Sequence, residues 1–360
     1  MWEKGISAFA GLDHAPETNS SYLRLAHQYG YTRLFTSFHI PEANPNAFVG
    51  DFRRLVTEAT NLGFAVTADI SRSAFSSMGA SLQDVSPLKE WGLSAIRLDF
   101  GFSPAEIAAI TATSNLDVEI NASTVTAAIL EDMSQKKVNF SRIRACHNYY
   151  PRPETGLSFA VFAERSSLLR HYGIPVFAFI PSLNSPRAPL YAGLPTIEKH
   201  RNLSPEVAAK ELLACELLQG LLFGDPLAAE RDLAAVAALD SSCLELQVVV
   251  EQDISPAERA ILFAPFHTNR VDSGEYALRS HEARSFCKAA IDPRTAMPRE
   301  TGDITIDNQS YGRYMGEMQI IITPLPADSR VNVVAHVIPE EQFLLSHIRP
   351  GSSFRLKEVR

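Results

Sequence analysis

A recurring unit of a helix, a glycine and a short apolar strand organises the first two-thirds of this chain. The unit occurs in LAHQYGYTRLFTSF around Gly30, in EATNLGFAVTADI around Gly63, in LKEWGLSAIRLDF around Gly92 and in LLRHYGIPVFAFI around Gly173. Glycine just after a helix adopts the left-handed conformation that closes the last helical turn. Helices that alternate with apolar strands in this way predict βαβ units and parallel strands.

The number of predicted strands indicates the fold class, which is α/β with a (β/α)8 or TIM barrel. The predicted strands are Ile6–Gly11, Arg33–Phe38, Ala65–Ile70, Ala95–Phe100, Asp117–Asn121, Arg142–His147, Val176–Ile180 and Gly220–Phe223. Helix starts agree, because Ser103 and Glu106 form a capping box around Pro104, and Ser204 with Pro205 begins another helix. An open, doubly wound sheet is the alternative, but the chain has no GxGxxG or Walker A phosphate loop.

The pattern changes after about Leu239. The runs CLELQVVVEQ, DITIDN, MGEMQIIITPL and VNVVAHVI are rich in β-forming residues and have little helix between them. We therefore predict a barrel domain over residues 1–239 and a small, mainly β domain over residues 240–360.

Composition excludes several classes of function. A net charge of -8 argues against a nucleic-acid partner, which would require a basic face. The four cysteines, Cys146, Cys215, Cys243 and Cys287, form no CxxC pair, so a disulfide framework or zinc knuckle is not expected. The sequence shows no secretory signal and no apolar run of about 20 residues. We expect a cytoplasmic protein with no membrane partner and, as an open possibility, a homo-oligomer.

Polar side chains follow the predicted strands where they end, which is where a (β/α)8 barrel carries its reactive groups. These residues are Thr36, Ser37, His39, Glu42, Asp69, Asp99, Glu119, Asn121, Ser123, His147 and Asp225. An acid at a strand end costs desolvation energy unless it is paired or used. We therefore predict that several carboxylates converge on one rim of the barrel.

A structural role is an open alternative for each of these residues. Asp69 and Asp99 can cap the following helix or hold a loop, Glu119 can point outward between helices, and His39 can be a loop residue. Cys146 is expected in the barrel core rather than as a nucleophile.

The stretch RACHNYYPRPETG, residues 144–156, predicts a rigid polar loop after the sixth strand. Its two prolines fix their own φ angles and favour extended conformations before them. Arg152 lies between the prolines and Glu154 follows, and Arg is suited to bidentate binding of phosphate or carboxylate. Tyr149 and Tyr150 offer ring faces for a sugar. The alternative is a structural loop closed by an Arg–Glu pair.

Carboxylates on one rim, with aromatic faces and Asn donors, favour glycosidic chemistry. Cleavage of a glycosidic bond uses one carboxyl group to protonate the leaving oxygen and another to attack or to activate water. A metal site is the alternative, since the same residue types are ligands, but no HxH or HExxH pair is present. We expect neither a metal nor another cofactor.

The motifs TSFHIPE, RLDFG, NASTV, HNYYPRPETG, AGLPTIEKHR and TGDITIDNQSYGRYMGEMQI together resemble the bacterial 6-phospho-N-acetylmuramidase family over nearly the whole chain. The resemblance implies a TIM barrel followed by a cyclophilin-like β domain. It also implies a cytoplasmic glycosidase of peptidoglycan recycling. Its substrate would be the small phosphorylated amino-sugar disaccharide N-acetylmuramic acid 6-phosphate–N-acetylglucosamine.

Such a substrate carries a phosphate and a lactyl carboxylate, so arginines are expected in its site. Arg152 is the candidate from the barrel. Arg270 in HTNRVD and Arg313 in NQSYGRYMGE are candidates from the β domain, which can instead serve only for stability or dimerisation.

The sequence leaves the assignment of the catalytic residues open. Asp99 is our choice for one essential carboxylate, and Glu119, Glu154 and Asp69 compete for the second role. The acetamide of the substrate can also act as the nucleophile. The remaining predicted substrate-binding residues are His39, Asn121, His147, Asn148 and Tyr149. A metal-dependent sugar-phosphate isomerase or aldolase, and a non-catalytic sugar-phosphate binding protein, are the alternative functions.

Overall fold

The computed structural model describes residues 2–12, 15–38, 48–72, 74–98, 101–113 and 116–359. Within it the chain divides into two compact units, Met1–Ala238 and Leu239–Arg360. The predicted boundary between residues 239 and 240 lies one residue beyond this division.

The first unit is a closed barrel of eight parallel strands, in which β1 pairs with both β2 and β8. The strands are β1 (Glu3–Ser7), β2 (Arg33–Ser37), β3 (Ala65–Asp69), β4 (Ala95–Arg97), β5 (Asp117–Asn121), β6 (Ile143–Cys146), β7 (Val176–Ile180) and β8 (Gly220–Phe223). The predicted (β/α)8 barrel is therefore confirmed.

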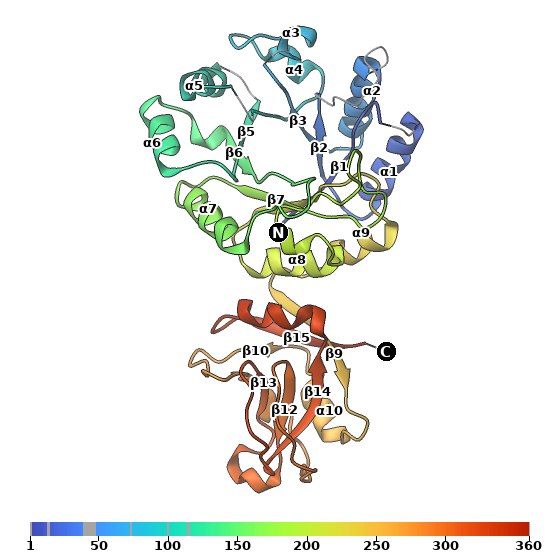
Figure 1. The fold of residues 1–360 in the computed structure, drawn as a ribbon, viewed down its shortest axis with the longest axis vertical. Helices are drawn as coiled ribbons and strands as arrows, with labels where there is room; N and C mark the ends of the chain where they lie inside the picture. The colour runs from blue at the N-terminus through green and yellow to red at the C-terminus, as the bar shows by residue number, and fades with distance from the viewer. Residues whose placement is uncertain are drawn as a thin grey trace. The chain divides into compact units, whose positions relative to one another are not determined.

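Helices surround the strands of this unit (Figure 1). They are α1 (Pro16–Gln28), α2 (Phe48–Asn61), α3 (Ala74–Ser77), α4 (Ser86–Glu90), α5 (Pro104–Thr113), α6 (Ala127–Gln135), α7 (Phe159–His171), α8 (Pro205–Ala214) and α9 (Glu230–Ala237), with short 3-10 turns η1 (Phe140–Arg142) and η2 (Glu198–His200). The four glycines that the sequence places between a helix and the following strand all have positive φ, for example 75° at Gly30 and 71° at Gly173. The N–H of Ser103 donates to Glu106 Oε2 at 2.8 Å, and the Ser204 side chain caps α8, as the helix-start signals predict.

The first strand begins earlier in the chain than predicted. The expected strand Ile6–Gly11 is in fact β1, Glu3–Ser7. Ala8, Phe9 and Ala10 are buried although they follow the end of the strand. An apolar run is the signal for burial, and a buried loop gives the same signal as a buried strand.

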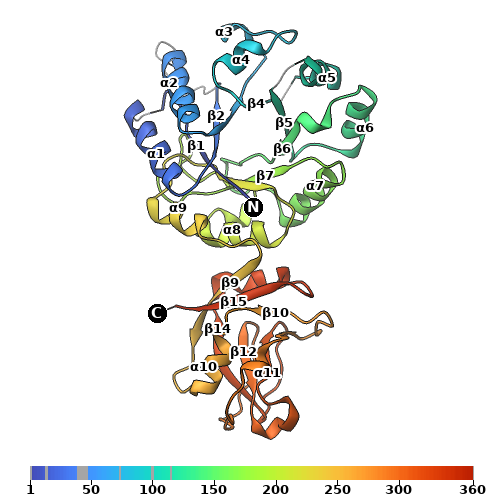
Figure 2. The same cartoon turned by 180° about the vertical axis from the view of Figure 1, so that it is seen from behind.

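The second unit contains a seven-stranded sheet in the order β10-β15-β9-β14-β12-β13-β11. Figure 2 labels β9, β10, β12, β14 and β15 of this sheet. Its strands are β9 (Cys243–Val250), β10 (His267–Thr268), β11 (Ala277–Arg279), β12 (Asp303–Asp307), β13 (Met318–Ile321), β14 (Val331–Val337) and β15 (Ser353–Glu358). The four β-rich runs noted in the sequence form β9, β12, β13 and β14. All pairings are antiparallel except that of β15 with β9.

One face of this sheet carries the core of the second unit. Leu246, Val248, Ile304, Ile306 and Phe354 belong to a single buried cluster. The helical segments of this unit are α10 (Pro256–Leu262), α11 (Ala283–Phe286), η3 (Gln309–Tyr314) and η4 (Pro339–His347). In the part of the chain that the structure describes, no helix is both long and apolar enough to cross a bilayer.

Candidate active site

A cavity of about 180 Å³ opens among the carboxyl-terminal halves of the barrel strands and the segment after β6. It is lined by Phe35, Asp69, Arg97, Asn148, Tyr149 and Phe179. Because these residues come from β2, β3, β4, the loop after β6 and β7, only closure of the barrel brings them together. This is the end at which (β/α)8 enzymes carry their active sites.

A buried ion pair lies at this level of the barrel. Asp69 is the register partner of Arg97, and Arg97 is the register partner of Glu119, so the three side chains point to the same side of the sheet. Arg97 Nη1 lies 3.2 Å from Glu119 Oε1, and the two side chains are only 4% and 5% exposed. Arg97 also donates to the carbonyl oxygen of Cys146 at 3.0 Å and to Asn148 Oδ1. The pair therefore holds Asn148 at the cavity.

Aromatic rings form one wall of the cavity. The Phe35 and Phe179 ring centroids are 5.2 Å apart, and the Tyr149 ring lies 5.1 Å from Phe179 and 6.1 Å from Phe35, all edge to face. Such packing makes a rigid, largely apolar surface. The polar side chains Asp69, Arg97 and Asn148 complete the lining, so the cavity has distinct apolar and polar parts.

The hydroxyl group of Tyr149 lies among several charges. Arg187, from the loop after β7, donates to it at 3.3 Å. Burial raises the pKa of Tyr149, and the Asp69 charge raises it further, while the charges of Arg187 and Arg97 oppose that rise. The phenol is therefore protonated at neutral pH and can donate a hydrogen bond.

The predicted loop of residues 144–156 is held by two residues outside it. Glu198 accepts the backbone N–H groups of Glu154 at 2.8 Å and Gly156 at 2.6 Å. Arg201 donates to the carbonyl oxygens of Tyr150 at 2.9 Å and Arg152 at 3.3 Å, and it is ion-paired with Glu198. Arg201 above all, with these N–H groups, lowers the pKa of Glu198 to about 2.

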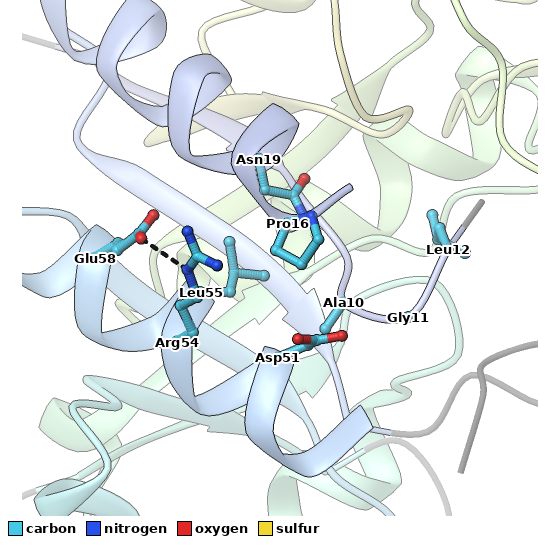
Figure 3. Close-up of a pocket in the computed structure, with 9 residues that line it drawn as sticks. All are labelled: Ala10, Gly11, Leu12, Pro16, Asn19, Asp51, Arg54, Leu55 and Glu58. Carbon is cyan, nitrogen blue, oxygen red and sulfur yellow. Dashed lines mark hydrogen bonds and ion pairs between the residues drawn. The ribbon is translucent and has the colours of Figure 1, made fainter. Parts of the chain in front are cut away.

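A second hollow beside the loop after β1 is much smaller (Figure 3). Its volume is about 30 Å³, which is enough for roughly one or two water molecules. Arg54 at its edge is ion-paired with Glu58 at 3.1 Å and Glu17 at 2.9 Å. Its size and the pairing of Arg54 make it a weaker candidate for a substrate site than the barrel cavity.

The two units match the two parts of one protein family. Residues 4–238 match the model for the N-terminal domain of 6-phospho-N-acetylmuramidase, and residues 244–357 match the model for its C-terminal domain. The chain belongs to the 6-phospho-N-acetylmuramidase family. It is therefore an enzyme of the glycosidase type, and the barrel cavity is its candidate active site.

Two solved structures resemble nearly the whole chain. A B. cereus protein described as uncharacterized is 31% identical, with a TM-score of 0.90 over 99% of each chain. A conserved Enterococcus faecalis protein described as having an unknown function is 33% identical, with a TM-score of 0.75 over 99% of this chain and 96% of that one. The comparison with curated proteins found no match.

Of the four predicted catalytic carboxylates, Asp69 lines the cavity. Glu119 lies in the buried pair with Arg97. Glu154 is exposed on its loop, with φ of 69°. Asp99 lies outside the described residues, as does the predicted binding residue His39.

Asn148 and Tyr149 line the cavity, whereas His147 and Asn121 do not. His147 is fully buried and packs on Phe162 of α7, with ring centroids 4.9 Å apart. It faces away from the barrel interior because neighbouring strand residues alternate sides, and Cys146 takes the interior side as expected for a core residue. Burial above all, and then the Arg97 charge, lower the pKa of His147 to about 3. Asn121 accepts the N–H of Ser123 at 2.9 Å.

The predicted arginines are exposed or paired. Arg152 is exposed, and its loop shows no ion pair between Arg152 and Glu154 in the described structure. In the second unit, Arg270 makes a two-point ion pair with Asp272, with both hydrogen bonds at 2.8 Å. Arg313 donates to the Tyr314 hydroxyl at 2.9 Å and lies over its ring.

Sequence reasoning missed Arg97, Arg187, Glu198 and Arg201. Arg97 had a signal, because it is a charged residue inside the apolar run SAIRL. Glu198 and Arg201 belong to the motif AGLPTIEKHR, in which we assigned them no role, and Arg187 lies in a loop that carried no local pattern. The residues described include no group of three or more His, Cys, Asp and Glu side chains arranged to hold a metal ion.

Proposed function

We propose that this protein hydrolyses the glycosidic bond of N-acetylmuramic acid 6-phosphate–N-acetylglucosamine and releases the two sugars. The observation that carries the proposal is the match of both units, in order, to the domains of 6-phospho-N-acetylmuramidase. The proposal includes a cytoplasmic role in peptidoglycan recycling, because sugar phosphates occur inside cells. The description of the second unit as cyclophilin-like stays a prediction.

For the chemistry, we propose Asp69 and Asp99 as the reacting carboxylates. Asp69 is at the end of β3 and lines the cavity, and Asp99 follows β4, the neighbouring strand. One carboxyl group would protonate the leaving oxygen, and the other would attack the sugar or activate water. If the acetamide group of the substrate attacks instead, a single acid suffices.

Glu119 is proposed to act through Arg97. A carboxylate paired with an arginine in nearly complete burial is well placed to hold that arginine ionised and oriented. Arg97 in turn holds Asn148, whose side chain we propose contacts the sugar. Glu154 and Arg152 are proposed to contact the part of the disaccharide that extends to the rim loop.

His147 and Asn121 are proposed to position Asn148 through Ser123. Ser123 Oγ accepts the Asn148 N–H at 2.9 Å and lies 3.2 Å from His147 Nδ1, while His147 Nε2 lies 3.0 Å from Ser166 Oγ. A neutral His147 with its proton on Nε2 satisfies both contacts, because Ser123 can then donate to Nδ1. Tyr149 supplies a ring face, and Arg270 and Arg313 remain proposed binding residues of the second unit.

The test is to incubate the purified full chain with the phosphorylated disaccharide, with its unphosphorylated form, and with the phosphorylated form plus EDTA. We expect cleavage of the phosphorylated sugar alone, unaffected by EDTA. Cleavage that EDTA abolishes would mean that hydrolysis requires a metal ion, whereas no cleavage even without EDTA would leave the metal-dependent isomerase or aldolase as an alternative. Binding without cleavage would support a non-catalytic sugar-phosphate binding protein.

A further inference from the structure

The loop after β7 places Arg187 at the edge of the barrel cavity. Asp225, which is fully buried after β8, accepts three backbone N–H groups of this loop. They are those of Ser182 at 3.1 Å, Arg187 at 3.1 Å and Leu194 at 2.9 Å. A carboxylate with three such bonds fixes the loop backbone, so the position of Arg187 does not depend on its own side chain.

The guanidinium group of Arg187 rests on aromatic rings. Its central carbon lies 4.6 Å from the ring centroid of Phe9 and 5.5 Å from that of Tyr149. Its one hydrogen bond to another side chain in the described structure is Nη1 to the Tyr149 hydroxyl at 3.3 Å. No carboxylate of the described residues lies within ion-pair distance of it.

The neighbouring arginines are different. Arg97 is paired with Glu119, and Arg201 is paired with Glu198. A guanidinium group has five N–H donors, and among the described residues the Arg187 side chain uses one of them, on the phenol. A half-buried cation with remaining donors, stacked on rings, is suited to binding an anion in two-point geometry.

Tyr149 connects Arg187 to the cavity, because it touches Arg187 and also lines the cavity with Asp69 and Asn148. The charges of Arg187 and Asp69 both act on the Tyr149 hydroxyl, so the cation and the candidate catalytic acid both lie near one phenol group. A sugar in the cavity would therefore have an acid and a cation within reach.

We propose that Arg187 binds an anionic group, a phosphate or a carboxylate, of the sugar held in the barrel cavity. This inference deepens the proposed function and rests on it for the choice of sugar. It assigns substrate-anion recognition inside the barrel to Arg187, a residue that the sequence motifs did not indicate.

The experiment measures equilibrium binding to the full chain by calorimetry, with four sugars. N-acetylmuramic acid 6-phosphate carries both anions, N-acetylglucosamine 6-phosphate only the phosphate, N-acetylmuramic acid only the carboxylate, and N-acetylglucosamine neither. The variants are Arg187→Gln and Arg187→Lys. The matched control is Arg24→Gln, since Arg24 is exposed on α1 and bonds only Ser21 in the described structure.

We expect Arg187→Gln to weaken binding of N-acetylmuramic acid 6-phosphate about 10- to 100-fold, the range for losing a charged hydrogen-bond partner. Arg187→Lys should retain part of the affinity, because lysine keeps the positive charge but lacks the planar pair of N–H donors that arginine offers. If, of the two single-anion sugars, only N-acetylglucosamine 6-phosphate shows the same loss, the phosphate is the bound group. If only N-acetylmuramic acid shows it, the carboxylate is the bound group. Arg24→Gln should bind all four sugars as the wild type does.

Three results of the binding experiment would overturn the inference. They are unchanged binding of every anionic sugar by both Arg187 variants, an equal loss for neutral N-acetylglucosamine, and no binding of any anionic sugar by the wild type. Cleavage is measured separately on the phosphorylated disaccharide. Anion binding through Arg187 without cleavage would remove the proposed function and keep this inference, whereas cleavage with an unchanged KM in Arg187→Gln would do the reverse.

Discussion

The two ends of the barrel differ in how their arginines are neutralised. At the amino ends of the strands, Arg33 pairs with Glu3, and Arg142 and Arg144 both pair with Asp117. At the carboxyl ends, Arg187 contacts rings and a phenol, with no carboxylate of the described residues in ion-pair range. The amino end thus satisfies its charges within the protein, and the carboxyl end keeps a cation available to a ligand. This agrees with the division in (β/α)8 enzymes between a stabilising end and a reactive end.

Arg97 and Glu119 combine the two roles. Their opposite charges are paired with each other, like those at the amino end, but this ion pair lies against the cavity and holds Asn148. The comparison therefore predicts that changes at the amino end alter stability alone, that changes at Asp69 alter catalysis alone, and that changes at Arg97 alter both.

The largest expected effect is that of Asp69→Asn. Loss of a proposed reacting carboxylate should lower kcat about a thousandfold, within the range for general acid–base catalysis, with little change in stability. Steady-state hydrolysis of the phosphorylated disaccharide measures it. The matched control is Asp117→Asn at the opposite end, which should keep kcat and lose about 1 kcal/mol of stability. Equal kcat for the two variants would contradict the division between the ends.

Arg97→Met should destabilise the barrel by about 3 to 5 kcal/mol, because it leaves Glu119 as an uncompensated buried charge. Trp2 and Trp91 are the only tryptophans of the chain and both lie in the barrel unit, so their fluorescence in urea reports this unit. The double variant Arg97→Met/Glu119→Gln should recover much of the stability while activity stays low. Recovery of both would mean that the pair serves stability alone.

Arg152→Ala and Glu154→Gln should each give a folded protein with kcat/KM at least about a hundredfold lower, the scale of a charged contact to the transition state. The fold should survive, because Glu198 and Arg201 hold the loop through its backbone. Initial rates at low substrate concentration measure the effect. Turnover near that of the wild type in both variants would show that the reactive end does not include this loop.

His147 should make the barrel less stable in acid. Burial lowers its pKa to about 3, below the value of about 6.5 in an unfolded chain. At His147 the unfolded chain therefore binds a proton more readily than the folded chain does. The contribution of buried, neutral His147 to the free energy of unfolding is complete above about pH 6.5 and decreases as the pH falls toward 3. Urea unfolding at pH 7.5 and pH 5.0 should show a smaller pH-dependent loss for His147→Gln than for the wild type. An identical loss in both would assign the pH dependence to other groups.

The smallest expected effect is that of Glu3→Gln at the amino end. Its ion pair with Arg33 is partly exposed, so its loss should cost about 1 kcal/mol or less. The cost is seen in urea unfolding, and the kinetic constants for the disaccharide should not change. A clear fall in kcat would mean that the two ends of the barrel are coupled.

The sequence predicted the barrel and the order of its strands well, because the signals are local. A glycine that closes a helix and the apolar strand that follows it act within a few residues. The same reasoning displaced the first strand onto the buried loop at Phe9, and it overlooked the short strands β10 and β11 and the six-residue strand β15. Short or buried segments carry too little periodicity to be assigned from sequence.

The lining of the candidate site could be predicted in part, and the roles of its residues stay predictions. Asp69, Asn148 and Tyr149 line the cavity because each lies in or just after a strand at the carboxyl end, which the sequence shows. His147 was predicted beside them, yet it packs on α7. The side that a strand residue takes depends on register, and a shift of one residue reverses it.

The sequence by itself determined the alternation of helices and strands, the change to a β-rich second unit, and the presence of a rigid polar loop after the sixth strand. Each depends on residues close together in the chain. The tertiary structure decided that Arg97 pairs with Glu119, that Glu198 and Arg201 hold the loop, and that Arg187 stacks on Phe9 and Tyr149. These contacts join residues far apart in sequence, and they form only when the closed barrel sets which strands and loops are neighbours.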